Sequence, residues 1–336
     1  MTLSLRRLMT SVVGLLIVTS ATFAASTPAR AAGTIDDHVD AVLVISVDGF
    51  NPRAIGLLGP SRAPALFRLK REGAFTLQAR TEYESTATLP NHTGMMTGRR
   101  VEAAQGGHGV TINEDDGSTV HAYAGERVRS VFNRVHNQAG PTALFAGKDK
   151  FDLLQRSWPK AIDRYTRLGS NPALVDAVLQ DLNNTRRALT FVHLSKPDGV
   201  GHQEGFMSAA YLDAVAETDI QIGRILDAVQ SDPWRRAHMV VILTADHGGK
   251  GARHYDVTKK YNYRIPFFAW GAGIKPTGLY AINPKLAKPG SGRPGYSGPQ
   301  PIRNGMVANL VTDLLDIKPV PGSELDRPRV LRVFTP

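Results

Sequence analysis

Six carboxylate and imidazole side chains occur in short groups whose spacing suits metal binding. Two are four positions apart with glycines between them, two are adjacent, and the others follow an apolar run or a short loop. They are Asp48, Asp198, His202, Asp246, His247 and His254. A single Asp before Gly is commonly a turn residue. Together, three carboxylates and three imidazoles form an oxygen and nitrogen donor set that can hold two divalent ions, and zinc suits these donors.

A hydroxyl that can act as a nucleophile lies in the segment Thr88-Leu89-Pro90-Asn91-His92. Thr88 can cap a helix whose first turn contains Pro90, which is a purely structural interpretation. The same geometry suits catalysis, because a helix N-terminus offers N–H donors and a favourable dipole to a phosphate. A nearby divalent ion would activate the hydroxyl for attack.

The elements that must position these residues alternate between apolar runs and amphipathic segments. We expect strands over residues 40–47, 75–79, 142–146, 189–194, 239–244 and 265–270. We expect helices over residues 64–72, 127–138, 171–184, 208–230 and 303–315, and a surface loop rich in Pro, Gly and Ser over residues 276–301. Continuous apolar runs are typical of strands buried on both faces. This alternation predicts an α/β fold with a mainly parallel central sheet and helices on both faces.

Polar residues follow directly after four of these expected strands. They are Asp48, Lys148, Asp198 and Asp246. In open parallel sheets, ligands bind beyond the C-terminal ends of the strands. The sequence therefore predicts one site at that edge of the sheet.

The first 31 residues are typical of a cleavable signal peptide. Arg6 and Arg7 precede an apolar stretch from about Met9 to Ala25, and Ala29-Arg30-Ala31 fits a small-x-small cleavage site. The stretch is short for a spanning helix, so we expect no stable membrane span after cleavage. We expect residues 32–336 to form a single domain of a secreted or extracytoplasmic protein. Export by the general or the twin-arginine route stays open.

Composition narrows the function further. The chain contains no cysteine, which excludes disulfides, thiolate ligands and a cysteine nucleophile. Its hydrophobic fraction of 42% indicates a globular protein with a sizeable core. The net charge of +10 favours attraction of anions. No dense basic block with interleaved aromatics is present, so we expect no nucleic-acid-binding role.

The order of the motifs resembles the alkaline phosphatase superfamily, in its type I phosphodiesterase/nucleotide pyrophosphatase branch. That branch combines Asp-Gly after a strand, Thr-Phe-Pro-Asn-His, His-Gly-x-x-x-Asn, Asp-x-x-x-His, Asp-His-Gly and a final His. In the same order, this sequence contains Val47-Asp48-Gly49, the segment 88–92, His108-Gly109 with Asn113, Asp198 with His202, Asp246-His247-Gly248 and His254. Each motif is weak alone, and the ordered set over residues 40–315 carries the resemblance.

The resemblance implies an alkaline-phosphatase-like fold and hydrolysis of a small phosphorylated substrate at a two-zinc site. Thr88 would form a phospho-threonine intermediate, and Asn113 would hydrogen-bond a non-bridging phosphoryl oxygen. One zinc would be held by Asp198, His202 and His254. The other would be held by Asp48, Asp246 and His247, with Thr88 bridging toward it.

Two departures from the branch leave the substrate open. Members that grip nucleotides tend to have an aromatic after the nucleophile and a Tyr five residues before the metal-binding Asp, whereas this chain has Leu89 and His193. A base-stacking pair is therefore missing. In addition, Lys148-Asp149-Lys150 resembles an element of phosphonoacetate hydrolases and threonine-dependent alkaline phosphatases. Lys148 and Lys150 would then bind a more highly charged substrate, a monoester or a phosphonate, although a solvated loop pair is an equal alternative.

Two further classes of function suit these residues less well. A zinc-dependent protein that captures phosphorylated ligands without turnover would not need a metal-activated hydroxyl at Thr88. Sulfatases of the superfamily convert a Cys or Ser to formylglycine, which Thr88 cannot undergo. The sequence leaves the oligomeric state open.

Overall fold

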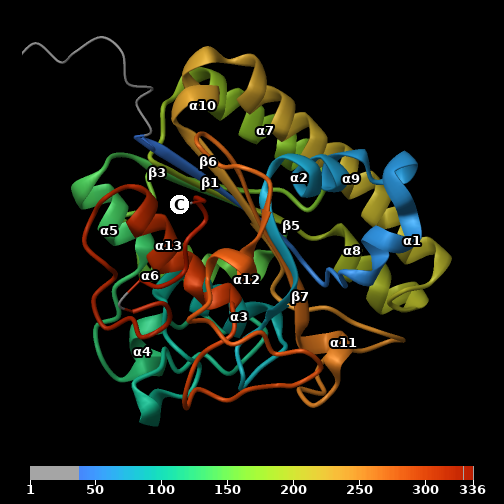
Figure 1. The fold of residues 1–336 in the computed structure, drawn as a ribbon. Coiled ribbons are helices and arrows are strands. Elements are labelled where there is room, and N and C mark those ends of the chain that lie inside the picture. Colours follow the sequence, from blue (N-terminus) through green and yellow to red (C-terminus); the bar gives the residue numbers. More distant parts are fainter. Residues whose placement is uncertain (1–37, 328, 336) are drawn as a thin grey trace, which may run out of the picture. The chain divides into compact units, whose positions relative to one another are not determined.

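The computed structural model describes residues 38–327 and 329–335, shown in Figure 1. The expected signal peptide lies outside these residues. None of the described helices combines the length and the hydropathy that crossing a bilayer requires.

Within the described residues, eight strands form one sheet in the order β4-β3-β5-β1-β6-β7-β2-β8. The strands are β1 (Ala41–Val47), β2 (Ala74–Arg80), β3 (Thr142–Ala146), β4 (Arg164–Arg167), β5 (Leu189–Leu194), β6 (Met239–Thr244), β7 (Arg264–Gly271) and β8 (Thr277–Gly278). The five from β4 to β6 in this order are parallel. β7 runs antiparallel to both β6 and β2. The prediction of a mainly parallel α/β sheet is confirmed.

Helices cover both faces of the sheet (Figure 1). One layer consists of α1 (Arg53–Arg62), α2 (Pro64–Glu72), α7 (Asn171–Asn184), α8 (Lys196–Val200), α9 (Ala209–Ser231) and α10 (Pro233–His238), and α9 contacts all the others. On the other face lie α3 (Thr88–Thr97), α5 (Val131–Gln138) and α13 (Val307–Leu314). Shorter helices are α4 (Val120–Ala124), α6 (Asp152–Ser157), α11 (Lys260–Tyr263) and α12 (Leu279–Ile282).

The central strands form where the sequence is apolar without interruption. All residues of β1, β3, β5 and β6 are buried, as expected for a parallel sheet covered on both faces. The long helix α9 begins where the hydroxyl of Ser208 accepts the Tyr211 N–H, which is an N-cap bond. The same strands therefore supply the core and hold the loops that follow them.

Three sequence predictions need correction. The helix expected over 127–138 begins only at Val131, because Ser130 and Asn133 form a capping box that fixes its start. The segment 276–301 is not simply a surface loop, since it contains β8 and α12 and buries Leu279. The helix expected over 303–315 starts as a 3₁₀ turn and becomes α-helical at Val307.

Two buried arginines explain why the segment 276–301 is ordered against the sheet. The guanidinium of Arg80 donates to the carbonyls of Gly290 and Gly292, and that of Arg303 donates to the carbonyls of Pro294 and Gly295. Charged donors satisfy loop carbonyls that secondary structure does not. Pattern analysis of a Gly- and Pro-rich stretch cannot detect such contacts.

Candidate active site

The C-terminal ends of four neighbouring parallel strands supply one polar cluster. Asp48 follows β1, Lys148 follows β3, Asp198 lies on α8 after β5, and Asp246 follows β6. Gly49 turns the chain after Asp48 with a φ of +67°. A side chain on Gly49 would come within 3.1 Å of the Cα of Asp198, so glycine allows these two segments to approach.

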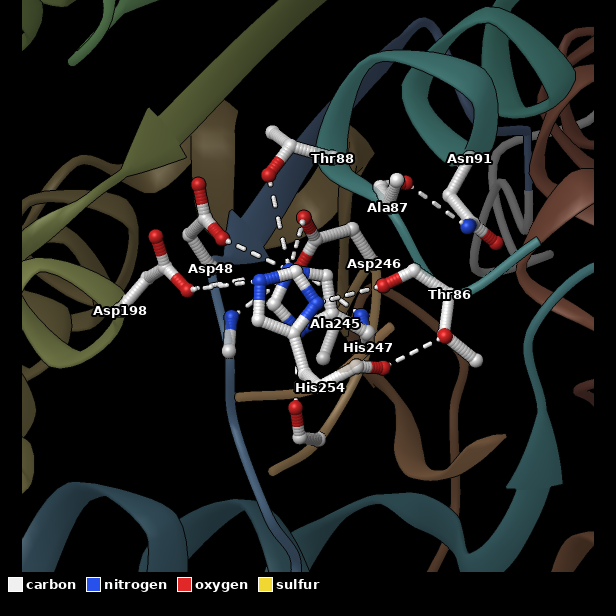
Figure 2. A network of polar contacts seen from close by, with 12 residues as sticks. Asp48, Thr86, Ala87, Thr88, Asn91, Asp198, Ala245, Asp246, His247 and His254 are labelled. Carbon is white, nitrogen blue, oxygen red and sulfur yellow. Dashed lines mark hydrogen bonds and ion pairs between the residues drawn. The ribbon is translucent and has the colours of Figure 1, made fainter. Parts of the chain in front are cut away.

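Asp48, Asp246 and His247 form the first group of possible metal ligands, and all three are fully buried. The Nε2 of His247 lies 3.3 Å from Asp48 Oδ1 and 3.3 Å from Asp246 Oδ2. The Nδ1 of His247 is 2.8 Å from the Gly248 carbonyl, which assigns the Nδ1 hydrogen to that bond. In the neutral ring, Nε2 then carries a lone pair, and this nitrogen faces two carboxylates (Figure 2).

Asp198, His202 and His254 form the second group. His202 lies in a π-helical turn, Gly201–Gly205, a local distortion that is frequent at functional sites. The Nδ1 atoms of His202 and His254 each face a backbone carbonyl, at 3.3 and 2.7 Å. Their Nε2 atoms lie 3.1 Å apart and within 3.7 Å of Asp198 Oδ1. Two imidazole lone pairs and a carboxylate oxygen that meet in this way are a donor set that a divalent cation would satisfy.

The carboxylate oxygens support the same conclusion. Asp48 Oδ1, Asp198 Oδ1 and Asp246 Oδ2 are buried without a hydrogen-bond partner. The second oxygen of each group is engaged: Asp246 Oδ1, for example, accepts the N–H groups of Gly49 and His247. An unpartnered buried carboxylate oxygen is costly. The donor set therefore fits divalent ions, with one unpartnered oxygen in the second group and two in the first.

The electrostatics of the cluster favour positive charge. Burial opposes protonation of His247, but the carboxylates of Asp246, Asp48 and Asp198 raise its pKa to about 9. Burial also opposes ionisation of Asp48, yet the ammonium of Lys148 and the hydrogen bond from His193 hold the pKa of Asp48 well below its usual range. Burial, reinforced by His247, lowers the pKa of His254 to about 2, so this imidazole is neutral. Burial raises the pKa of Asp246 to about 8. A bound cation would displace the protons of His247 and Asp246, because neutral imidazoles and ionised carboxylates are the forms that bind metals.

Thr88 is the first residue of α3 and is buried beside the first group. Its Oγ1 lies 3.5 Å from His247 Nε2, and Figure 2 shows it directed toward Asp48 and His247. Asn113 lies on the other side of this helix end, where its Oδ1 accepts the N–H of Leu89 at 3.0 Å. The donating NH₂ group of Asn113 remains available for a further partner.

The helix end that carries Thr88 is fixed by neighbours that the sequence did not reveal. His92 is fully buried, with Nδ1 2.8 Å from the Thr88 carbonyl and Nε2 2.8 Å from the hydroxyl of Ser46 on β1. Thr86 accepts from His254 through its carbonyl and donates its hydroxyl to the His254 carbonyl. The helix end that carries the nucleophile candidate is therefore bonded to β1 and to the second ligand group.

The two lysines of the segment 148–150 take different partners. The ammonium of Lys148 lies between the two ligand groups, 2.7 Å from Asp48 Oδ2 and 2.5 Å from Asp198 Oδ2. Burial opposes protonation of Lys148, but both aspartates outweigh it and raise its pKa above the usual range. Lys150 instead contacts Glu114 at 2.9 Å, next to Asn113. Their binding of substrate stays a prediction.

The two positions at which a base-stacking pair is missing both lie in the protein interior. Leu89 and His193 are fully buried. His193 directs its Nε2 to Asp48 Oδ2 at 2.9 Å. A spacing argument could not have revealed this contact, because it depends on the pairing of β5 with β1.

Comparison with known proteins identifies a matching family and several relatives of this chain. The family described as type I phosphodiesterase / nucleotide pyrophosphatase matches residues 42–289. Ectonucleotide pyrophosphatase/phosphodiesterase family member 1 is 27% identical over 222 residues in Homo sapiens and 24% identical over 220 residues in Mus musculus, in each case over 61% of this chain. The chain spans about a quarter of the length of these relatives, 23% and 24%.

A solved structure supports the fold. Murine ectonucleotide pyrophosphatase/phosphodiesterase 5, in an inactive form in complex with AMP, superposes with a TM-score of 0.59 at 14% identity. The match covers 84% of this chain and 96% of that chain. At this identity the likeness concerns the architecture, which is alkaline-phosphatase-like.

Proposed function

Because this chain belongs to the type I phosphodiesterase/nucleotide pyrophosphatase family, we propose that it is an exported, zinc-dependent hydrolase of phosphate esters. The observation that carries the proposal is the juxtaposition of Thr88 with two groups of ligands that contain unpartnered buried carboxylate oxygens. Export rests on the residues expected to form a signal peptide.

Two groups of residues would hold the ions. They are Asp48, Asp246 and His247, with Thr88 bridging toward this group, and Asp198, His202 and His254. When bound, two divalent ions at such a site supply charge stabilisation for the attacking and leaving oxygens and a reactive hydroxide near neutral pH. The protein contributes fixed ligand geometry, because carbonyl oxygens orient the imidazoles through their Nδ1 atoms.

The reaction proposed for Thr88 proceeds in two displacements. Its Oγ1 loses its proton and attacks phosphorus, the bond from phosphorus to the ester oxygen breaks, and the leaving alkoxide takes up a proton and departs as the alcohol. Water then cleaves the bond between Thr88 and phosphorus, which restores the hydroxyl and releases a phosphate monoester from a diester substrate, or inorganic phosphate from a monoester. The NH₂ group of Asn113 would donate to a non-bridging oxygen, where negative charge concentrates in the transition state.

We favour a diesterase because of the family, with a monoesterase or phosphonate hydrolase as the alternative. The observation that favours the alternative is the position of Lys148 and Lys150 beside the ligand groups and Asn113. A second positive charge near the reacting phosphate favours a dianionic monoester or a carboxylate-bearing phosphonate. The burial of Leu89 and His193 leaves neither of these two positions free to stack on a nucleobase.

A side-by-side kinetic comparison tests the proposal. The mature protein, with its metal content measured, is assayed on p-nitrophenyl phosphate, bis-p-nitrophenyl phosphate and phosphonoacetate. We expect diester turnover that falls by about 10⁴-fold or more in Thr88→Ala, as for other nucleophile deletions. Failure on all three substrates by zinc-loaded protein would contradict the proposed function, and full activity of Thr88→Ala would contradict the nucleophile assignment.

A further inference from the structure

His193 has surroundings that a residue in contact with substrate would not have. It lies on β5 and is fully buried. Its ring stacks on Phe151, with centroids 4.3 Å apart, and packs edge-on against His92 at 4.8 Å. These contacts fix the plane of the imidazole, so that its two nitrogens point at defined partners.

The hydrogen bonds of His193 define which nitrogen carries the hydrogen. The backbone N–H of Gly147 donates to Nδ1 at 3.2 Å, so Nδ1 is the acceptor of the ring. The hydrogen must then be on Nε2, which donates to Asp48 Oδ2 at 2.9 Å. A side chain on Gly147 would come within 2.6 Å of Ser195 Oγ, so glycine allows the close approach of this backbone.

The two carboxylate oxygens of Asp48 have different surroundings. Oδ2 receives His193 and, at 2.7 Å, the ammonium of Lys148. Oδ1 is buried without a hydrogen-bond partner and faces His247 Nε2 at 3.3 Å. The backbone and the side chain of the segment 147–148 thus converge on one oxygen, one through His193 and the other directly.

We propose that His193 is a positioning residue that holds Asp48 Oδ2 and thereby presents Asp48 Oδ1 to a divalent ion. The inference rests on the proposed function, because it takes Asp48 as a metal ligand. Partners of this kind set ligand orientation, and their loss typically lowers metal affinity by about 10- to 100-fold. Position 193 in this chain therefore supports a metal ligand, whereas family members that bind nucleotides tend to have a Tyr there.

Zinc titration against a chromogenic chelator tests the inference without using turnover. His193→Phe keeps a planar ring but donates no hydrogen bond, whereas His193→Gln restores an N–H donor of similar reach. His121→Phe, at a half-buried histidine that contacts Ser157 far from the ligand groups in the chain, is the matched control. A His202→Ala variant identifies the binding event that belongs to the second group.

We expect His193→Phe to lower the zinc affinity of the group Asp48, Asp246 and His247 by about 10- to 100-fold and to leave the affinity of the second group unchanged. His193→Gln should recover affinity, and His121→Phe should bind both ions as the unmodified protein does. Unchanged affinity in His193→Phe would overturn the inference, and so would equal weakening of both events, which indicates a general structural effect.

Nitrogen NMR of the unmodified protein gives an answer even if His193→Phe does not fold. We expect the His193 ring with its hydrogen on Nε2, and a hydrogen on Nδ1 would overturn the inference. The two proposals fail separately. Protein that binds two ions in a manner dependent on His193 but hydrolyses no ester contradicts the proposed function alone. An active enzyme whose metal affinity does not change when His193 is replaced contradicts this inference alone.

Discussion

Glu82 is a buried carboxyl whose titration should be measurable as a change in stability. It is 1% exposed, and its Oε2 accepts the hydroxyl of Tyr296 at 2.5 Å. Its Oε1 has no hydrogen-bond partner and lies against Gly94 and Gly305. Burial raises the pKa of Glu82 from 4.5 to about 7, and the nearby Arg303 only partly opposes this.

The sign and size of the effect follow from proton linkage. Between pH 4.5 and 7 the folded protein retains a proton that the unfolded chain releases, so the free energy of unfolding falls as the pH rises. At about 1.4 kcal/mol for each pKa unit, the difference amounts to roughly 3 kcal/mol. Glu82→Gln removes the ionisable group and keeps an acceptor for Tyr296. Part of the effect is already present at pH 5, so we expect the variant to gain stability over the unmodified protein between pH 5 and pH 8 by roughly 2.5 kcal/mol.

Urea unfolding followed by tryptophan fluorescence at pH 5, 6, 7 and 8, with the metal content held constant, measures this difference. Other titrating groups act in both proteins, so subtracting one curve from the other isolates Glu82. Glu324→Gln, at an exposed glutamate that accepts the Arg100 N–H, controls for the loss of a surface charge. Parallel curves for Glu82→Gln and the unmodified protein would refute the reasoning, because they would show that burial does not retain the proton.

Three further changes give distinct outcomes. Gly49→Ala should lower the free energy of unfolding by about 1–3 kcal/mol and weaken zinc binding, because φ is +67° and the new methyl group meets the Asp198 backbone. Calorimetry measures the first effect and zinc titration the second. The control is Gly56→Ala, where the added methyl group would have no atom within 4 Å. Removal of metal by a chelator should abolish hydrolysis and lower the melting temperature, and zinc should restore both; unchanged activity in verified metal-free protein would contradict a metal-dependent site. Replacing Lys148 and Lys150 by Met should reduce monoester hydrolysis more than diester hydrolysis if these lysines bind the second negative charge of the substrate. An equal loss on both substrates would show that they do not bind that charge.

The sequence was informative where a local pattern determines the structure. Uninterrupted apolar runs predicted β1 and β6, and the polar residues after them predicted which edge of the sheet carries the site. Because parallel strands end at one edge, the sequence predicted Asp48 and Asp246 at the same edge of the sheet, and the pairing of β1 with β6 makes them neighbours. The spacing of Asp198 and His202 placed both on the turns that follow β5.

Side-chain direction and long-range contacts were beyond the sequence. The contact of His193 with Asp48 exists because β5 pairs with β1 in a register that aligns Ser46 with His193. The bridging ammonium of Lys148 depends on the placement of β3 beside β5. The order within residues 276–301 depends on guanidinium groups from Arg80 and Arg303, which no local composition encodes.

The covalent intermediate is the most direct test of the central claim. Zinc-loaded protein is mixed with saturating bis-p-nitrophenyl phosphate, quenched in acid within the first turnovers and digested for mass spectrometry. The account predicts a p-nitrophenylphosphoryl adduct on the peptide that contains Thr88, at Thr88 itself, because one ester bond of the substrate is still intact at that stage. It predicts neither adduct nor turnover in Thr88→Ala. Continued hydrolysis by Thr88→Ala, with no adduct on that peptide in the unmodified enzyme, would contradict it.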